Sequence, residues 1–276
     1  MNVKAIILTG FGINCDWETA EAFRRAGADA QRVHLNEIIV SPALLENCHI
    51  LAVPGGFSFG DDIASGKVLA NRLRYKLGEP LKKFVADGKL MIGICNGFQA
   101  LVKLGILPRL EEKFVQEATL TYNDSGRFEN RWVNLVVEPR TRCAWLRGIS
   151  QLELTVRHGE GKFVPRDSSV LERLRANGQV ALRYAHLDGT PARGAYPANP
   201  NGSIEDIAGI CDPTGRVFGL MPHPEAHVDY THHPCWTRRL YDSGSLPVYD
   251  EDGPGLHVLQ NAIAYAKEML RGSPRP

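Results

Sequence analysis

Several features that assign a chain to a functional class are missing from this sequence. The formal net charge is only +1, so there is no electrostatic argument for binding nucleic acid or an anionic membrane. The six cysteines are scattered and form no CxxC pair, which is typical of a reducing compartment. No apolar run is long enough to cross a bilayer, and we expect a strand rather than a signal peptide near the N-terminus. We therefore predict a cytoplasmic protein.

Nucleotide-binding loops and repeats are missing too. The chain has no GxxxxGK[ST] and no GxGxxG pattern, so we do not expect ATP to bind to it. It has no internal repeat and no low-complexity segment. With 276 residues it is long enough to bury a sizeable core, in one large domain or two small ones.

The first third of the chain alternates apolar strands with helical segments. Strands are predicted at 4–9, 30–35, 50–53 and 90–94, and helices at 16–26, 42–46, 62–76, 79–87 and 98–104. This rhythm predicts an α/β fold, a flavodoxin-like doubly wound sheet with helices on both faces. Ligands of such sheets bind beyond the carboxyl ends of the strands.

The later part of the chain has a different pattern, with short strands in place of alternating strands and helices. Short strands are predicted at 132–137, 152–156, 180–184, 207–211 and 217–221, separated by turn-rich stretches. We expect an added antiparallel portion, so that the whole sheet is mixed but mostly parallel. An apolar stripe predicts a C-terminal helix at about 255–271.

The stretch around Cys95 is the strongest candidate for chemistry. Gly93 and Gly97 flank Cys95 where a strand becomes a helix, which is the pattern of a nucleophile elbow with cysteine in place of serine. Only glycines leave room in such a strained turn, and the helix N-terminus favours thiolate. The alternative is a buried cysteine at an ordinary strand end.

A catalytic thiol needs a base, and His223 is the best candidate. It follows an apolar strand, and Glu225 lies two residues further on, close enough to orient the imidazole. Prolines on both sides restrict its backbone. The alternative is a histidine in a surface turn.

A metal site near His223 and a phosphate-binding loop at Gly55–Gly56 have less support from the sequence. His223, His227, His232, His233 and Cys235 match no tight zinc pattern, so we predict no metal site. The Gly55–Gly56 pair lacks the residues of a phosphate-binding loop and suits backbone donors to an oxyanion better. The turn at 158–161 is either a substrate contact or only a turn.

Five motifs together resemble one family. Residues 53–61 (VPGGFSFGD), 93–99 (GICNGFQ), 158–161 (HGEG), 197–202 (PANPNG) and 221–225 (MPHPE) occur in the family's order. The chain resembles the class I (triad) glutamine amidotransferases and, more narrowly, the glutaminase components of phosphoribosylformylglycinamidine synthase. The resemblance covers about residues 4–265 and implies a single amidotransferase domain over 1–276, with an extended loop at 226–254 before the last helix.

The resemblance also implies roles for residues. Cys95 would be the nucleophile, His223 the general base and acid, and Glu225 the orienting carboxylate. Substrate binding and the oxyanion hole would fall to Gly55, Gly56, Phe57, Asn96, Gln99, His158, Gly159 and Glu160. The implied reaction hydrolyses L-glutamine through a thioester and passes ammonia on, with no cofactor in this chain.

The implied partner is a synthetase subunit, possibly with a small bridging subunit, and ATP and Mg²⁺ are expected on the synthetase. The chain departs from the family pattern at Phe59, where Tyr is common, and at Ala226, where Arg often follows the Glu. Its long segment after Glu225 resembles long single-chain synthases more than short subunits, which leaves the synthetase architecture open. Two further classes stay open: a cysteine hydrolase or peptidase acting alone, and a catalytically silent binding subunit.

Overall fold

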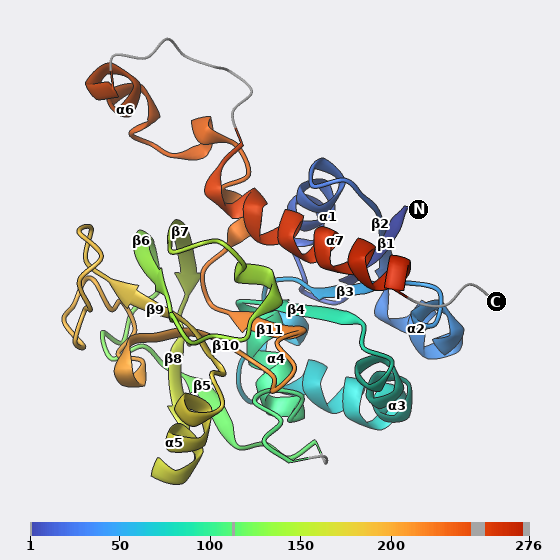
Figure 1. Cartoon of the computed structure of the whole chain (residues 1–276). Helices are drawn as coiled ribbons and strands as arrows, with labels where there is room; N and C mark the ends of the chain where they lie inside the picture. Colours follow the sequence, from blue (N-terminus) through green and yellow to red (C-terminus); the bar gives the residue numbers. More distant parts are fainter. Residues whose placement is uncertain (1, 112–113, 244–251, 273–276) are drawn as a thin grey trace.

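A computed structural model describes residues 2–111, 114–243 and 252–272, and its main feature is one nine-stranded mixed sheet (Figure 1). The strand order is β2-β1-β3-β4-β11-β10-β9-β6-β7. The strands are β1 (Val3–Thr9), β2 (Ala28–His34), β3 (Ile50–Val53), β4 (Leu90–Ile94), β6 (Glu129–Val137), β7 (Gln151–His158), β9 (Val180–Ala185), β10 (Ile207–Cys211) and β11 (Val217–Leu220). A separate two-stranded sheet pairs β5 (Ala118–Thr121) with β8 (Lys162–Pro165).

The first five strands in this order are parallel, and the others are antiparallel. β2-β1-β3-β4-β11 has the strand order of a flavodoxin-like sheet, although β11 comes from much later in the chain. β3, β4 and β11 are buried at every residue, which explains their uninterrupted apolar sequences. From β11 outward, the pairings with β10, β9, β6 and β7 are antiparallel. The predicted mixed sheet with an antiparallel portion is confirmed.

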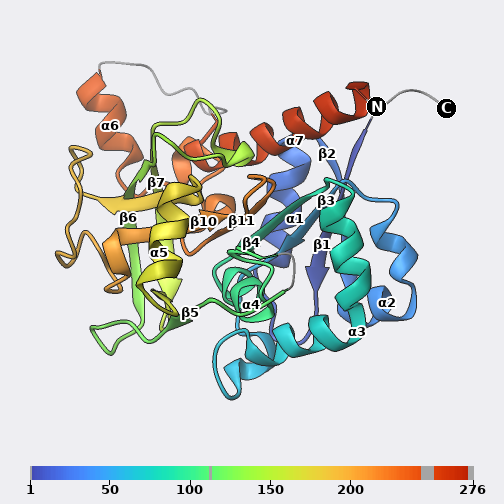
Figure 2. The same cartoon turned by 60° about the horizontal axis from the view of Figure 1, so that its bottom comes forward.

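Helices cover both faces of the parallel half, as predicted. The α-helices are α1 (Asp16–Arg25), α2 (Leu35–Val40), α3 (Lys67–Ala86), α4 (Asn96–Leu104), α5 (Ser168–Ala176), α6 (Trp236–Ser243) and α7 (Pro254–Gly272). α1 and α7 lie on one face, and α3 and α4 on the other (Figure 1). Figure 2 shows α5 and α6 beside the antiparallel half, away from α2 and α3.

The single helix α3 corrects one prediction. The sequence predicts two helical segments, around 62–76 and 79–87, but the structure has one helix that begins at Lys67 and continues through Pro80. Proline removes one backbone donor, which frees the carbonyl of Lys76. Lys76 is exposed, so water can bind this carbonyl and the helix continues.

Other differences concern short elements. The predicted helix at 42–46 is a 3₁₀ helix, Pro42–Leu45. The elements α2, α5, β5 and β8 were not predicted from the sequence. The predicted extended loop at 226–254 is also different, because its described part contains α6, the 3₁₀ helix Tyr230–His232 and the last residue of the 3₁₀ helix Pro224–Ala226. No helix in the described ranges combines the length and apolarity needed to span a bilayer.

Candidate active site

Cys95 occupies a sharp turn between β4 and α4. Its backbone has φ 51° and ψ −106°, a positive-φ conformation that is strained for a residue with a side chain. The flanking glycines are sterically required, because a Cβ on Gly97 would overlap the carbonyl oxygen of Val53, and one on Gly93 would lie 2.8 Å from Gly97. The local geometry is therefore that of a nucleophile elbow, with the thiol at the N-terminus of a helix.

The pairing of β4 with β11 brings His223 to this turn. Ile94 and Leu220 are register partners in the two parallel strands, and the Cys95 N–H donates to the Leu220 carbonyl at 2.8 Å. Three residues after this carbonyl, the N–H of His223 donates to the carbonyl of Thr155 on β7 at 2.8 Å. The imidazole is thus positioned from both halves of the sheet.

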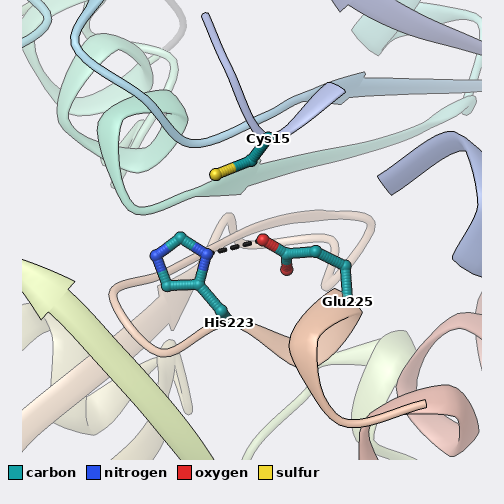
Figure 3. A group of neighbouring side chains, drawn as sticks. All are labelled: Cys15, His223 and Glu225. Carbon is teal, nitrogen blue, oxygen red and sulfur yellow. Dashed lines mark hydrogen bonds and ion pairs between the residues drawn. The ribbon is translucent and has the colours of Figure 1, made fainter. Parts of the chain in front are cut away.

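His223 and Glu225 form a buried pair (Figure 3). The Nδ1 atom of His223 lies 2.5 Å from Oε1 of Glu225, so Nδ1 carries the proton and Nε2 faces away from the carboxylate. Burial alone lowers the pKa of His223. The Glu225 carboxylate and the Cys95 thiol outweigh this effect, and the pKa lies well above its ordinary value. The imidazolium form is therefore favoured, which suits an ion pair with a thiolate.

A second thiol, Cys15, lies beside the same imidazole and was not predicted as part of the site. Its sulfur points toward the ring of His223 (Figure 3), and its N–H donates to the carbonyl of Gly55 at 3.2 Å. Burial raises the pKa of Cys15, although the neighbouring imidazole lowers it in part. Cys15 is thus held mainly as a neutral thiol.

A pocket of about 220 Å³ opens onto the thiol. Its lining includes Cys15, Gly56, Phe57, Cys95, Arg157 and His223. The half-exposed rings of Phe57 and Phe128 stack with centroids 6.3 Å apart in the lining of this pocket. The structure thus brings Cys95, His223 and Phe57 together around a cavity of small-molecule size.

Two backbone N–H groups near the thiol have no acceptor. Within the described residues, the N–H groups of Gly56 and Asn96 donate no hydrogen bond. Asn96 begins α4, so its N–H also belongs to the positive end of the helix dipole. Gly56 has φ 140°, and a Cβ there would lie 2.5 Å from the carbonyl oxygen of Gly12. Gly55 has to be glycine as well, because a Cβ there would lie 2.8 Å from the His223 ring.

The side chains of Asn96 and Gln99 and the backbone of Glu160 form a network away from the pocket lining. Asn96 Nδ2 donates to Gln99 Oε1 at 2.9 Å, and Gln99 Nε2 donates to the backbone carbonyl of Glu160. The Glu160 carboxylate accepts from the N–H of Ser65 at 3.3 Å. The geometry therefore connects these predicted substrate residues to one another and to the elbow.

His158 and Gly159 also lie outside the pocket lining. The buried His158 Nδ1 is 3.1 Å from Oδ1 of Asn123, and the N–H of Asn123 donates to the carbonyl of Gly159. Burial lowers the pKa of His158 to about 3, and the nearby His223 adds to this effect. His158 is therefore neutral at physiological pH.

The histidines that follow His223 do not gather around it. His227 Nδ1 lies 2.7 Å from the carbonyl of Glu153, and His233 Nε2 lies 3.1 Å from the carboxylate of Glu153. In the part of the chain that the structure describes, the only group with metal-ligand proximity is Cys15, His223 and Glu225. Its imidazole and carboxylate are already bonded to each other, as a catalytic pair requires.

Comparison with known proteins places this site in a family. The model of the CobB/CobQ-like glutamine amidotransferase domain matches residues 2–266. A phosphoribosylformylglycinamidine synthase subunit PurQ of Dehalococcoides mccartyi is 46% identical over 267 residues, with 97% of this chain and 99% of the relative covered. A protein of the same name from Methanococcus maripaludis is 38% identical, with 95% and 97% covered.

Solved structures agree with this. A chain from the structure of PurLQS of Thermotoga maritima superposes with a TM-score of 0.69 at 29% identity, covering 96% of this chain and 99% of that one. A glutamine amidotransferase of Thermotoga maritima, at 14% identity and a TM-score of 0.52, covers 99% of this chain and 100% of its own and shares the fold. With its elbow cysteine, its buried His–Glu pair and these near full-length matches, the chain belongs to the PurQ family of phosphoribosylformylglycinamidine synthase subunits, within the CobB/CobQ-like glutamine amidotransferases.

Proposed function

We propose that this chain is the glutaminase subunit of a phosphoribosylformylglycinamidine synthase. It hydrolyses L-glutamine to glutamate and ammonia through a thioester on Cys95. The observation that carries the proposal is the convergence of the strained Cys95 turn and the buried His223–Glu225 pair on one pocket of amino-acid size. A single amidotransferase domain is part of the proposal, supported by the family match over residues 2–266.

The reaction begins when the Cys95 thiolate attacks the side-chain amide carbon of glutamine. The oxyanion accepts hydrogen bonds from the free N–H groups of Gly56 and Asn96, and each donor contributes about 3–4 kcal/mol to lowering the barrier. The imidazolium of His223 protonates the departing ammonia, which leaves a thioester and a neutral imidazole. His223 then takes a proton from water, which attacks the thioester and releases glutamate.

Glu225 and Cys15 have supporting places in this scheme. The Glu225 carboxylate fixes the His223 tautomer and stabilises the imidazolium. Cys15 packs against the imidazole as a neutral thiol. The network of Asn96, Gln99 and Glu160 holds the first turn of α4 and the turn after β7 in place, so these side chains support the oxyanion hole.

Ammonia is useful only if a partner captures it. We propose a synthetase subunit that uses ATP and Mg²⁺ to convert formylglycinamide ribonucleotide to formylglycinamidine ribonucleotide, with a small bridging subunit in the complex. The PurQ names of the relatives and the name PurLQS of the structural neighbour support this assembly. A cytoplasmic location belongs to the same proposal, supported by six cysteines that are all free thiols.

The test is a glutaminase assay with and without the purified synthetase partner. The wild type should release glutamate from L-glutamine, faster in the complex, whereas Cys95→Ser should be inactive under both conditions. Peptide and ester substrates serve as controls for a hydrolase that acts alone. Hydrolysis of these substrates without release of glutamate from glutamine would overturn the proposal.

A further inference from the structure

Arg157 brings an unpaired positive charge to the active-site pocket. Among the residues that line the pocket it is the only lysine or arginine, and no aspartate or glutamate lines it. We propose that the Arg157 guanidinium binds the α-carboxylate of the substrate and so selects a free α-amino acid. This inference rests on the proposed glutaminase function and deepens it.

The position of Arg157 in the sheet fits this role. It lies on β7 two residues after Thr155, whose carbonyl accepts from the N–H of His223, so the side chains of Thr155 and Arg157 share one face of the strand. Its own carbonyl lies 3.6 Å from the Cys95 sulfur. The same residue therefore contacts the nucleophile through its backbone, and it lines the pocket together with Asn130, its register partner on β6.

The guanidinium has no acceptor within the described residues. Its Nε and Nη2 atoms are buried without a hydrogen-bond partner. By contrast, Arg131 on the neighbouring strand β6 is paired with Glu129 at 2.6 Å and donates to the Tyr196 hydroxyl. Buried donors without acceptors are destabilising, and a guanidinium offers parallel N–H groups that match a carboxylate. The unpaired guanidinium of Arg157 is therefore suited to bind an anionic ligand.

Glutamine carries such an anion, its α-carboxylate, at the end opposite the side-chain amide that Cys95 attacks. The amide carbon that Cys95 attacks and the α-carboxylate carbon are joined by three carbons, so both ends can lie in one small pocket. With the amide at Cys95 and the oxyanion at Gly56 and Asn96, the other end of the substrate extends along the cavity that Arg157 lines. A substrate with no α-carboxylate would leave the guanidinium unpaired, so it should be selected against.

The test compares L-glutamine with L-glutamine α-amide, which lacks the carboxylate, in the complex with the synthetase partner. We expect Arg157→Met to raise KM for glutamine by about 10- to 100-fold, with kcat within about threefold of the wild type. KM for the α-amide should not change, so the preference of the wild type for glutamine should disappear. Arg157→Lys, which keeps the charge but not the fork, should give an intermediate KM. Arg131→Met is the matched control and should behave as wild type.

The outcomes separate this inference from the function on which it rests. If Arg157→Met keeps the wild-type KM for glutamine and the wild-type preference over the α-amide, the assignment of Arg157 is wrong while the glutaminase function stands. If the wild type itself releases no glutamate, the proposed function fails. Should Arg157→Met melt below the assay temperature, Arg157→Lys provides the same comparison, and an unchanged KM there overturns the inference.

Discussion

The N–H of Cys95 donates to the carbonyl of Leu220 at 2.8 Å, which joins the carboxyl ends of β4 and β11. These two residues are far apart in the sequence, but Cys95 directly follows β4 and Leu220 ends β11, the parallel neighbour of β4. The turn that carries the Cys95 thiol and the segment that carries His223 both begin at these strand ends. The position of Cys95 relative to His223 is therefore set by strand pairing in the core.

Removing the carboxylate of Glu225 should change the pH dependence of turnover. The raised pKa of His223 keeps the imidazolium present below that pKa and loses it as the pH rises through it. In Glu225→Gln the pKa of His223 should fall, so the alkaline limb of the kcat profile moves to lower pH. By analogy with loss of the orienting carboxylate in other triads, kcat should fall about 100- to 10,000-fold. Glu172→Gln, on an exposed part of α5, should leave the profile unchanged, and an unshifted alkaline limb in Glu225→Gln would contradict the ion pair.

The two thiols beside His223 should not be equivalent. Burial raises the pKa of Cys15, and Cys95 directly precedes α4 at the elbow. We expect Cys95→Ala to lose at least about 1,000-fold in kcat and Cys15→Ala to stay within about tenfold of the wild type. Steady-state glutamate release measures both. Substantial turnover in Cys95→Ala together with loss of turnover in Cys15→Ala would identify Cys15, not Cys95, as the nucleophile.

The elbow should be intolerant of side chains for steric reasons. Gly97→Ala would place a Cβ against the Val53 carbonyl, so it should destabilise the fold by about 2–3 kcal/mol or more, measured by urea unfolding. Gly78→Ala is the control, because Gly78 lies within α3 and a Cβ there meets no atom within 4 Å. That variant should gain about 0.5–1 kcal/mol from helix propensity. Equal changes in the free energy of unfolding for the two variants would contradict the close approach of Gly97 to the Val53 carbonyl.

Glu153 should anchor the segment that carries α6. Its carboxylate accepts from Arg239 at 2.5 Å and lies 3.1 Å from Nε2 of His233. In Glu153→Gln, amide hydrogens of residues 236–240 should exchange about 5- to 100-fold faster, because a charge-assisted bond of about 1–3 kcal/mol is lost. Glu21→Gln, which breaks an exposed pair with Arg24, is the control. Unchanged exchange at 236–240 would show that Glu153 does not hold this segment.

The elbow and the His–Glu pair could be predicted from the sequence because each is a local pattern. Gly93 and Gly97 lie two residues before and two residues after Cys95 in a strand-to-helix turn, and His223 and Glu225 are two residues apart. Buried strands such as β4 and β11 are also visible as short apolar runs. The resemblance to amidotransferases rested on the order of such local motifs.

Cys15 and Arg157 could not be found in this way, because only the tertiary structure brings them to the site. Cys15 lies in the loop before α1, and Arg157 lies on an antiparallel strand from the other half of the sheet. A lone cysteine or arginine carries no signal until its neighbours are known. Pro80 shows the same limit for helices, because only the exposure of Lys76 shows that α3 tolerates it.

The most direct test of the central claim is to map the covalent intermediate. The wild-type complex should be reacted with a glutamine analogue bearing a diazoketone in place of the amide, then digested and analysed by mass spectrometry. We expect one adduct, on the peptide that contains Cys95, and strongly slowed labelling in His223→Ala. Labelling of Cys15 instead of Cys95, or labelling of Cys95 that does not depend on His223, would contradict the catalytic pairing of these two residues.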